Sequence, residues 1–112
     1  MAATPETIIR NKEQTSNLTD FRKDHILNRH RPDAGKSGKT EFPENWSDDK
    51  ILHHISDIAT DPKAKTGIGK WDSPYAIGKR DGIEIRVDFY PKNHKYAGKI
   101  STAYPINVTP NL

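Results

Sequence analysis

The apolar positions of this chain follow two different spacings, and the change between them divides the sequence into a helical part and a strand part. Before residue 61, apolar residues recur every three or four positions, which is the spacing of one face of an α-helix. From Tyr75 onward, apolar and polar residues alternate, as they do in half-buried β-strands. The sequence therefore predicts an α+β fold, with two N-terminal helices packed on an antiparallel sheet.

The first helix is expected at residues 18–30. Thr19 is a suitable N-cap, and Pro32 cannot continue a helix, so the helix should end near Arg31. The residues expected on one shared face are Leu18, Phe21 and His25.

The second helix, expected at residues 47–60, has the clearest pattern in the chain. Ser47 is its expected N-cap, and the two acidic residues that follow favour the positive end of the helix dipole. Pro62 lies just beyond its end. Its apolar stripe consists of Ile51, Leu52, Ile55, Ile58 and Ala59.

The second half of the chain predicts a three-stranded antiparallel meander. Strands near 75–80 and 83–90 are joined by Asp81-Gly82, a pair typical of tight hairpin turns, and a third strand is expected near 98–105. Segments 32–45 and 63–74, rich in Gly, Pro and Lys, are expected to be loops. The side chains expected to be largely buried are Trp46, Ile51, Ile55, Ile58, Ile85 and Val87.

The length of 112 residues fits one folded domain. Residues 1–17 are polar and without a period, so we interpret them as a linker or flexible arm and place the domain at 18–112. No apolar run exceeds three residues, so neither a membrane span nor a signal peptide is expected.

Charge is unevenly distributed along the chain. Residues 1–60 contain nine Lys/Arg and ten Asp/Glu, whereas residues 61–112 contain nine and five. A basic second half suits an anionic ligand such as RNA, although an ordinary surface explains the charge equally well. The absence of cysteine excludes disulfides within the chain and thiolate metal sites. No metal-binding or cofactor-binding motif is found, so no metal or cofactor is expected.

His25 and His30 are the first candidates for chemistry. Two histidines around one phosphate are what metal-free RNA cleavage requires, one to take the proton of the ribose 2′-OH and one to protonate the leaving 5′-oxygen. Five residues are too many for one helical face, but a break after residue 28 would turn both rings toward one point. Structural roles for both histidines are an open alternative.

Near the C-terminus, Thr102 and Tyr104 are expected on one face of the last strand together with Ile100. A hydroxyl and a phenol side by side can bind a base or a phosphate, although both residues also suit a half-buried strand. Lys39, in the glycine-containing loop after the histidines, is the candidate lysine, with Lys36, Lys70 and Lys99 as rivals.

Two stretches of the sequence resemble the bacterial EndoU nuclease family. The first is HILNRHRPDAGKSGKTEFPENWSDDKILHHISDIATDP at residues 25–62, and the second comprises GIEIRV from Gly82 and GKISTAYPIN up to Asn107. The combination of these motifs is far more specific than any one of them, and it covers most of the chain from His25 onward.

The resemblance implies a compact α+β ribonuclease domain, grouped with the barnase, colicin and RelE-like toxins. Such domains form the C-terminal toxic module of contact-dependent inhibition proteins and other polymorphic toxins, and a dedicated immunity protein neutralises each one. Family members cut RNA, often transfer RNA, without metal. By position, His25 matches the first family histidine, His30 is the candidate for the second, Lys39 for the lysine, and Thr102 and Tyr104 match the late Thr-x-Tyr pair.

The sequence therefore favours a metal-independent RNA endonuclease that leaves a 2′,3′-cyclic phosphate. We expect a toxin that is secreted or delivered from the cell surface as part of a larger protein, acts in the cytoplasm of the target cell and is inhibited by an acidic immunity protein. The alternatives are a non-catalytic RNA- or protein-binding module, and a metal-dependent DNase toxin.

Overall fold

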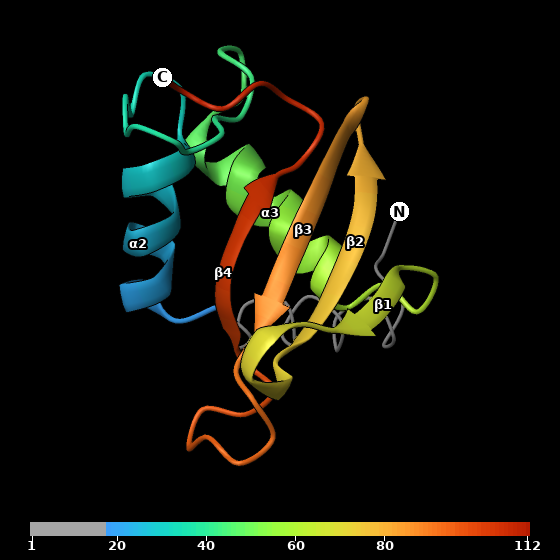
Figure 1. The fold of residues 1–112 in the computed structure, drawn as a ribbon. Helices are drawn as coiled ribbons and strands as arrows, with labels where there is room; N and C mark the ends of the chain where they lie inside the picture. Colours follow the sequence, from blue (N-terminus) through green and yellow to red (C-terminus); the bar gives the residue numbers. More distant parts are fainter. Residues whose placement is uncertain (1–17) are drawn as a thin grey trace.

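In the computed structural model, which describes residues 18–112, two helices pack against one four-stranded antiparallel sheet of order β1-β2-β3-β4 (Figure 1). This confirms the predicted α+β class. The arm expected at residues 1–17 lies outside the described residues.

Helix α2 (Asp20–His30) begins and ends where its capping residues predict. The Thr19 side chain accepts a hydrogen bond from the Arg22 amide at 3.3 Å, and Arg31 forms the C-cap in extended backbone, as expected for a residue before proline. The face predicted to hold Leu18, Phe21 and His25 is not the buried side of the helix, because Phe21 is 73% exposed whereas Ile26 and His30 are buried. The helix packs against β4.

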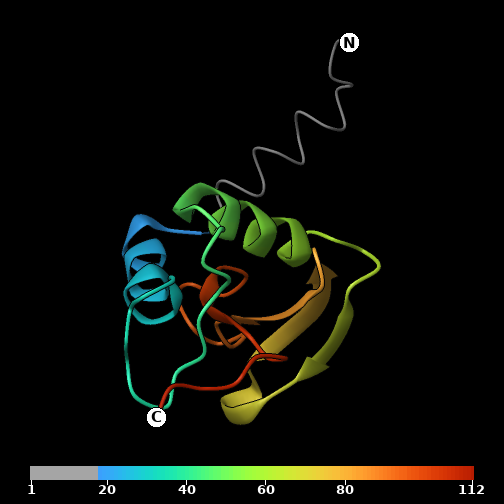
Figure 2. The same ribbon diagram turned by 90° about the horizontal axis from the view of Figure 1, so that it is seen from above.

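Helix α3 (Asp48–Ala59) covers one face of the sheet and packs on β2 and β3 (Figure 2). Its cap is as predicted, with Ser47 Oγ accepting from the Lys50 amide at 3.2 Å. Close approach to the sheet depends on Gly78, where a Cβ atom would come within 2.8 Å of the Ile58 side chain. The predicted core is confirmed, since the residues buried there include Trp46, Ile51, Ile55, Ile58, Ile85 and Val87.

The predicted meander is present as β2 (Pro74–Arg80), β3 (Ile83–Phe89) and β4 (Ile100–Pro105). The turn between β2 and β3 has positive φ at both Asp81 (49°) and Gly82 (80°), as a tight two-residue hairpin turn requires.

The loop expected at residues 63–74 is in part a fourth strand. β1 (Lys65–Ile68) pairs antiparallel with β2 and forms the edge of the sheet, and the short 3-10 turn η1 (Lys70–Asp72) follows it. Ile68 is exposed and the segment has no alternating apolar side chains. This strand is therefore formed by backbone pairing with β2, and the sequence contains no hydrophobic pattern that would predict it.

The strand β4 breaks the expected alternation. Asp88 of β3 pairs with Thr102, but Phe89 pairs with Ile100, so Ser101 is an extra residue at a bulge. Ile100 and Ala103 consequently both face the core and are fully buried. The prediction that Ile100 shares a face with Thr102 and Tyr104 was therefore wrong.

Candidate active site

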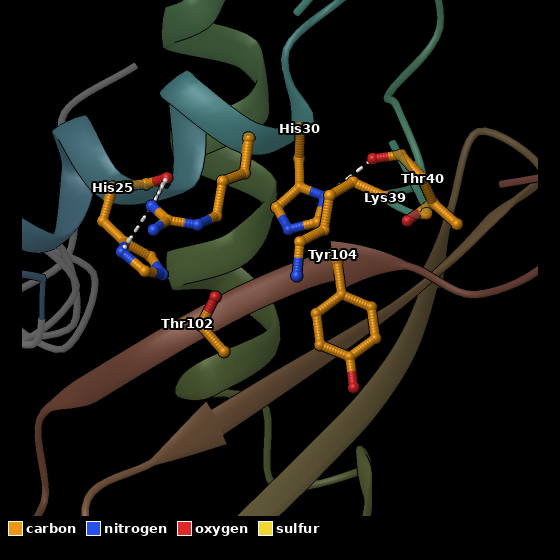
Figure 3. A pocket seen from close by; sticks show the side chains of 8 residues that line it. His25, His30, Lys39, Thr40, Thr102 and Tyr104 are labelled. Atoms are coloured by element: carbon orange, nitrogen blue, oxygen red, sulfur yellow. Dashed lines mark hydrogen bonds between the residues drawn. The ribbon is translucent and has the colours of Figure 1, made fainter. Parts of the chain in front are cut away.

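A cavity of about 400 Å³ lies between α2, the loop that follows it, and the outer face of β4 (Figure 3). The five residues singled out from the sequence all line it, together with three further residues of α2 and the loop. The lining consists of His25, Arg29, His30, Gly38, Lys39, Thr40, Thr102 and Tyr104.

Helix α2 contributes both histidines without the break that the sequence suggested. The helix is continuous to His30, so the two side chains differ by about 140° around its axis at 3.6 residues per turn. They reach one cavity because His30 is the last helical residue, where the chain turns back, whereas His25 faces β4 from the middle of the helix.

His30 is held in one orientation from two sides. Its Nδ1 lies 2.6 Å from the Thr40 carbonyl oxygen, and its ring stacks on Tyr104 with 5.6 Å between the ring centroids. A carbonyl can only accept, so Nδ1 carries a proton and Nε2 is the atom that gains or loses one. Burial lowers the pKa of His30, with Lys39 and Arg29 acting in the same direction and the Thr40 hydrogen bond opposing them.

His25 has the opposite hydrogen-bonding role. Arg29, one turn further along α2, donates from Nη1 to His25 Nδ1 at 2.7 Å, and a guanidinium has no acceptor to offer in return. Burial, followed by the charges of Arg22 and Arg29, lowers the pKa of His25 to about 4. Because both pKa values are lowered from 6.5, both imidazoles are neutral at pH 7.

The loop that carries Lys39 is tied to the C-terminal segment. The Thr40 hydroxyl donates to the Pro105 carbonyl at 2.7 Å, and the Asn111 side chain donates to the Lys36 carbonyl and to the Glu41 carboxylate. Backbone bonds join Gly38 and Lys39 to Asn111. These contacts hold the loop over the end of α2 and fix the position of Lys39.

Thr102 and Tyr104 share one face of β4, as the sequence predicts, and this face lies away from the core. They pair across the sheet with Asp88 and Arg86 of β3, so a polar row continues from the cavity over the outer face of the sheet. The pKa of the Tyr104 hydroxyl is raised, first by burial and then by the negative charge of Asp88. Tyr104 thus remains a neutral phenol able to donate a hydrogen bond.

Residues 5–107 match the family model of the bacterial EndoU nuclease. The chain belongs to this family. Membership in the EndoU family makes it an enzyme of the endoribonuclease class with RNA as its substrate. The matched range contains both helices, the whole sheet and all five candidate residues. No curated protein and no solved structure matches the chain.

Sequence reasoning missed Arg29 and Thr40. Arg29 follows His25 by four residues, a spacing that places two side chains on neighbouring turns of one helix face, so it could have been found. Thr40 acts through its backbone carbonyl and its hydroxyl at once, for which the sequence carries no signal. Of the rival lysines, Lys70 lines a neighbouring cavity, and neither Lys36 nor Lys99 lines the one that holds the histidines.

Residues 18–112 contain neither a metal-binding cluster nor a membrane-spanning helix. This part of the chain contains no group of three or more His, Cys, Asp or Glu side chains placed to hold a metal ion. It also has no helix long and apolar enough to cross a membrane.

Proposed function

We propose that this EndoU domain cleaves RNA without a metal ion, by attack of a ribose 2′-oxygen on the adjacent phosphorus. The 2′-O–P bond forms, the P–O5′ bond breaks, and the products carry a 2′,3′-cyclic phosphate and a 5′-hydroxyl. The observation that carries this proposal is the convergence of two imidazoles, an ammonium group and two hydroxyl groups on one cavity.

The hydrogen bonds suit the two histidines to different roles. Neutral His30 has its Nδ1 proton fixed on the Thr40 carbonyl, which leaves the Nε2 lone pair to accept the proton of the 2′-OH. His25 then acts as the acid that gives a proton to the leaving 5′-oxygen.

For His25 to be an acid it must first take up a second proton, and Arg29 occupies the nitrogen concerned. A phosphate in the cavity attracts the Arg29 guanidinium, for which it is a stronger acceptor than an imidazole. Movement of Arg29 onto the phosphate frees Nδ1, and the negative charge of the phosphate raises the pKa of His25. Substrate binding thereby produces the protonated acid.

Lys39 and the two hydroxyl groups complete the site. The Lys39 side chain points into the space between His30 and β4 (Figure 3), where an ammonium group stabilises the extra charge on the phosphorane-like transition state. Thr102 and Tyr104 donate to the phosphate or to the base beside it.

We further propose that the domain is the toxic C-terminal module of a larger antibacterial protein. It would be secreted or displayed at the cell surface, act in the cytoplasm of the target cell, with transfer RNA as a candidate substrate, and be neutralised by an acidic immunity protein. Support for this comes from the family's resemblance to contact-dependent inhibition toxins and from the cations around the cavity.

The test is incubation of the purified chain with total bacterial RNA, with and without a chelator, followed by mapping of the product ends. We expect cleavage in both reactions, cyclic phosphate ends, and no cleavage where the attacking ribose is replaced by deoxyribose. Intact RNA would favour the alternative of a non-catalytic binding module. Loss of cleavage with the chelator, or cleavage of DNA, would favour a metal-dependent nuclease.

A further inference from the structure

We propose that a second cavity, beside Trp71, is a subsite that binds a nucleobase flanking the scissile phosphate by stacking it on the Trp71 indole. The inference rests on the proposed ribonuclease function and extends it along the RNA strand.

The second cavity adjoins the first. It has a volume of about 550 Å³ and shares Thr102 and Tyr104 with the histidine cavity. The two cavities therefore lie on either side of the same two residues of β4. An RNA strand with its scissile phosphate at His25 and His30 places a neighbouring nucleotide within reach of the second cavity.

Trp71 is presented to solvent in a way that folding alone does not explain. Its side chain is 87% exposed, although burial of an indole is strongly favourable. No aromatic or cation–π contact within residues 18–112 involves its ring. The ring is thus available to a planar partner from outside the chain.

The backbone at this point is held in an unfavourable conformation. Both Trp71 (φ 61°) and Asp72 (φ 58°) adopt the left-handed region, which non-glycine residues rarely occupy. Hydrogen bonds between Gly69 and Ser73 (2.8 Å) and between Ser73 and Lys70 (3.1 Å) close the turn around them. Strain that the surrounding structure maintains is typical of functional positions.

The remaining lining suits a nucleotide. Lys70 and Arg86 bring positive charge, and Arg86 is fixed by its bond to Asp88 at 3.0 Å and by the face of Tyr75 at 4.2 Å. Gly69 admits the guanidinium, because a Cβ atom there would lie 2.8 Å from Arg86 Nη2. An aromatic platform with adjacent cations is the usual combination in single-strand binding.

The experiment combines a variant with a matching change in the RNA. Trp71→Gly removes the ring and relieves the left-handed backbone, so the fold should be retained, which thermal unfolding checks. The RNA is a short oligonucleotide with one ribose at the cleavage site, deoxyribose elsewhere, and an abasic nucleotide placed at each flanking position in turn. Phe21→Ala is the control, because Phe21 is also exposed (73%) but lines a different cavity.

We expect Trp71→Gly to lower kcat/KM on the order of 10- to 100-fold, as loss of one stacked base does. An abasic nucleotide at one position should cost the wild type the same factor and cost Trp71→Gly nothing further. Trp71→Phe should restore much of the rate, and Phe21→Ala should leave it unchanged. Independent, multiplying losses at every position would overturn the subsite while leaving the ribonuclease intact.

A binding measurement keeps the subsite testable even if no RNA is cut. The all-deoxy oligonucleotide should quench the indole fluorescence of the wild type, and in Trp71→Phe, which retains only the buried Trp46, the quenching should disappear. Equal quenching in both proteins would contradict stacking on Trp71.

Discussion

At the scale of single residues, substitution of His25 is the most direct test of the catalytic proposal. The side chain is half-buried at the edge of the cavity, and it accepts a hydrogen bond from Arg29. His25→Ala should lower the cleavage rate at least about 100-fold, the usual effect of losing a general acid or base. The free energy of unfolding should change little. His53→Ala is the matched control, because His53 is exposed on α3 outside the cavity. Near-normal cleavage by His25→Ala would remove His25 from the mechanism.

Arg29 should control the pH at which the enzyme works. Its charge is one of the causes that lower the pKa of His25 to about 4, so little protonated acid exists in the free enzyme at neutral pH. The ratio kcat/KM reports ionisation of the free enzyme and should therefore rise as the pH falls below 7. Arg29→Gln removes the charge and should raise the pKa of His25, which shifts this limb of the profile to higher pH.

For Arg29→Gln, the quantity to measure is the pH at which kcat/KM rises, and not the absolute rate, because the variant also loses a phosphate-binding cation. Arg31→Gln is a suitable control, since Arg31 is exposed, lies 3.5 Å from Asp48 and does not line the histidine cavity. An unchanged pH profile in Arg29→Gln would show that the guanidinium does not govern protonation of His25.

At the scale of elements, the loop at 31–47 depends on the C-terminal segment for its position. Asn111→Ala removes two side-chain hydrogen bonds to this loop and should lower stability by about 1–3 kcal/mol. Because Lys39 is bonded to the same segment, the cleavage rate should fall more than the stability loss explains. Asn107→Ala also removes two side-chain hydrogen bonds, at the far β2–β3 turn. Equal rates in the two variants would show that the loop keeps its place without Asn111.

The elements differ in how far the sequence predicts them. Helices α2 and α3 and strands β2 to β4 were predictable because capping residues, prolines, the Asp81-Gly82 turn and apolar spacing all have local physical causes. Strand β1 was not, because an exposed edge strand needs only backbone partners. The bulge at Ser101 was not predictable either, since it is set by pairing between β3 and β4. Both failures concern contacts between segments.

At the scale of the whole molecule, the five candidate residues and their convergence on one site were predictable from the sequence, but the hydrogen bonds that define their roles were not. Resemblance selected His25, His30, Lys39, Thr102 and Tyr104, and packing of α2 beside β4 brings them to one cavity. The role of Arg29 and the opposite hydrogen-bonding of the two imidazoles depend on side-chain geometry. No sequence pattern specifies which nitrogen of a histidine meets a carbonyl and which meets a guanidinium.

The same arrangement bears on the partner of the protein. The cations around the two cavities, Arg29, Lys39, Lys70 and Arg86, suit RNA phosphates, and a protein inhibitor of this site must present carboxylates to the same groups. Such an inhibitor should be acidic and bind rapidly by electrostatic steering, with an association rate that falls as salt is added. Covering both cavities requires no more than a standard interface of roughly 1,600 Å².

Expression of the chain alone in bacteria tests the toxin proposal and the need for an inhibitor together. Unaccompanied wild type should stop growth and degrade cellular RNA, whereas His25→Ala, produced at an equal level, should be tolerated. The inactive variant should still capture an acidic inhibitor, because the cationic residues are unchanged, and Lys39→Glu should weaken that capture. Normal growth and intact RNA with the wild type, in cells where the soluble protein accumulates, would contradict the toxin proposal. Cleavage of purified RNA by the same protein would show that the ribonuclease chemistry holds without it.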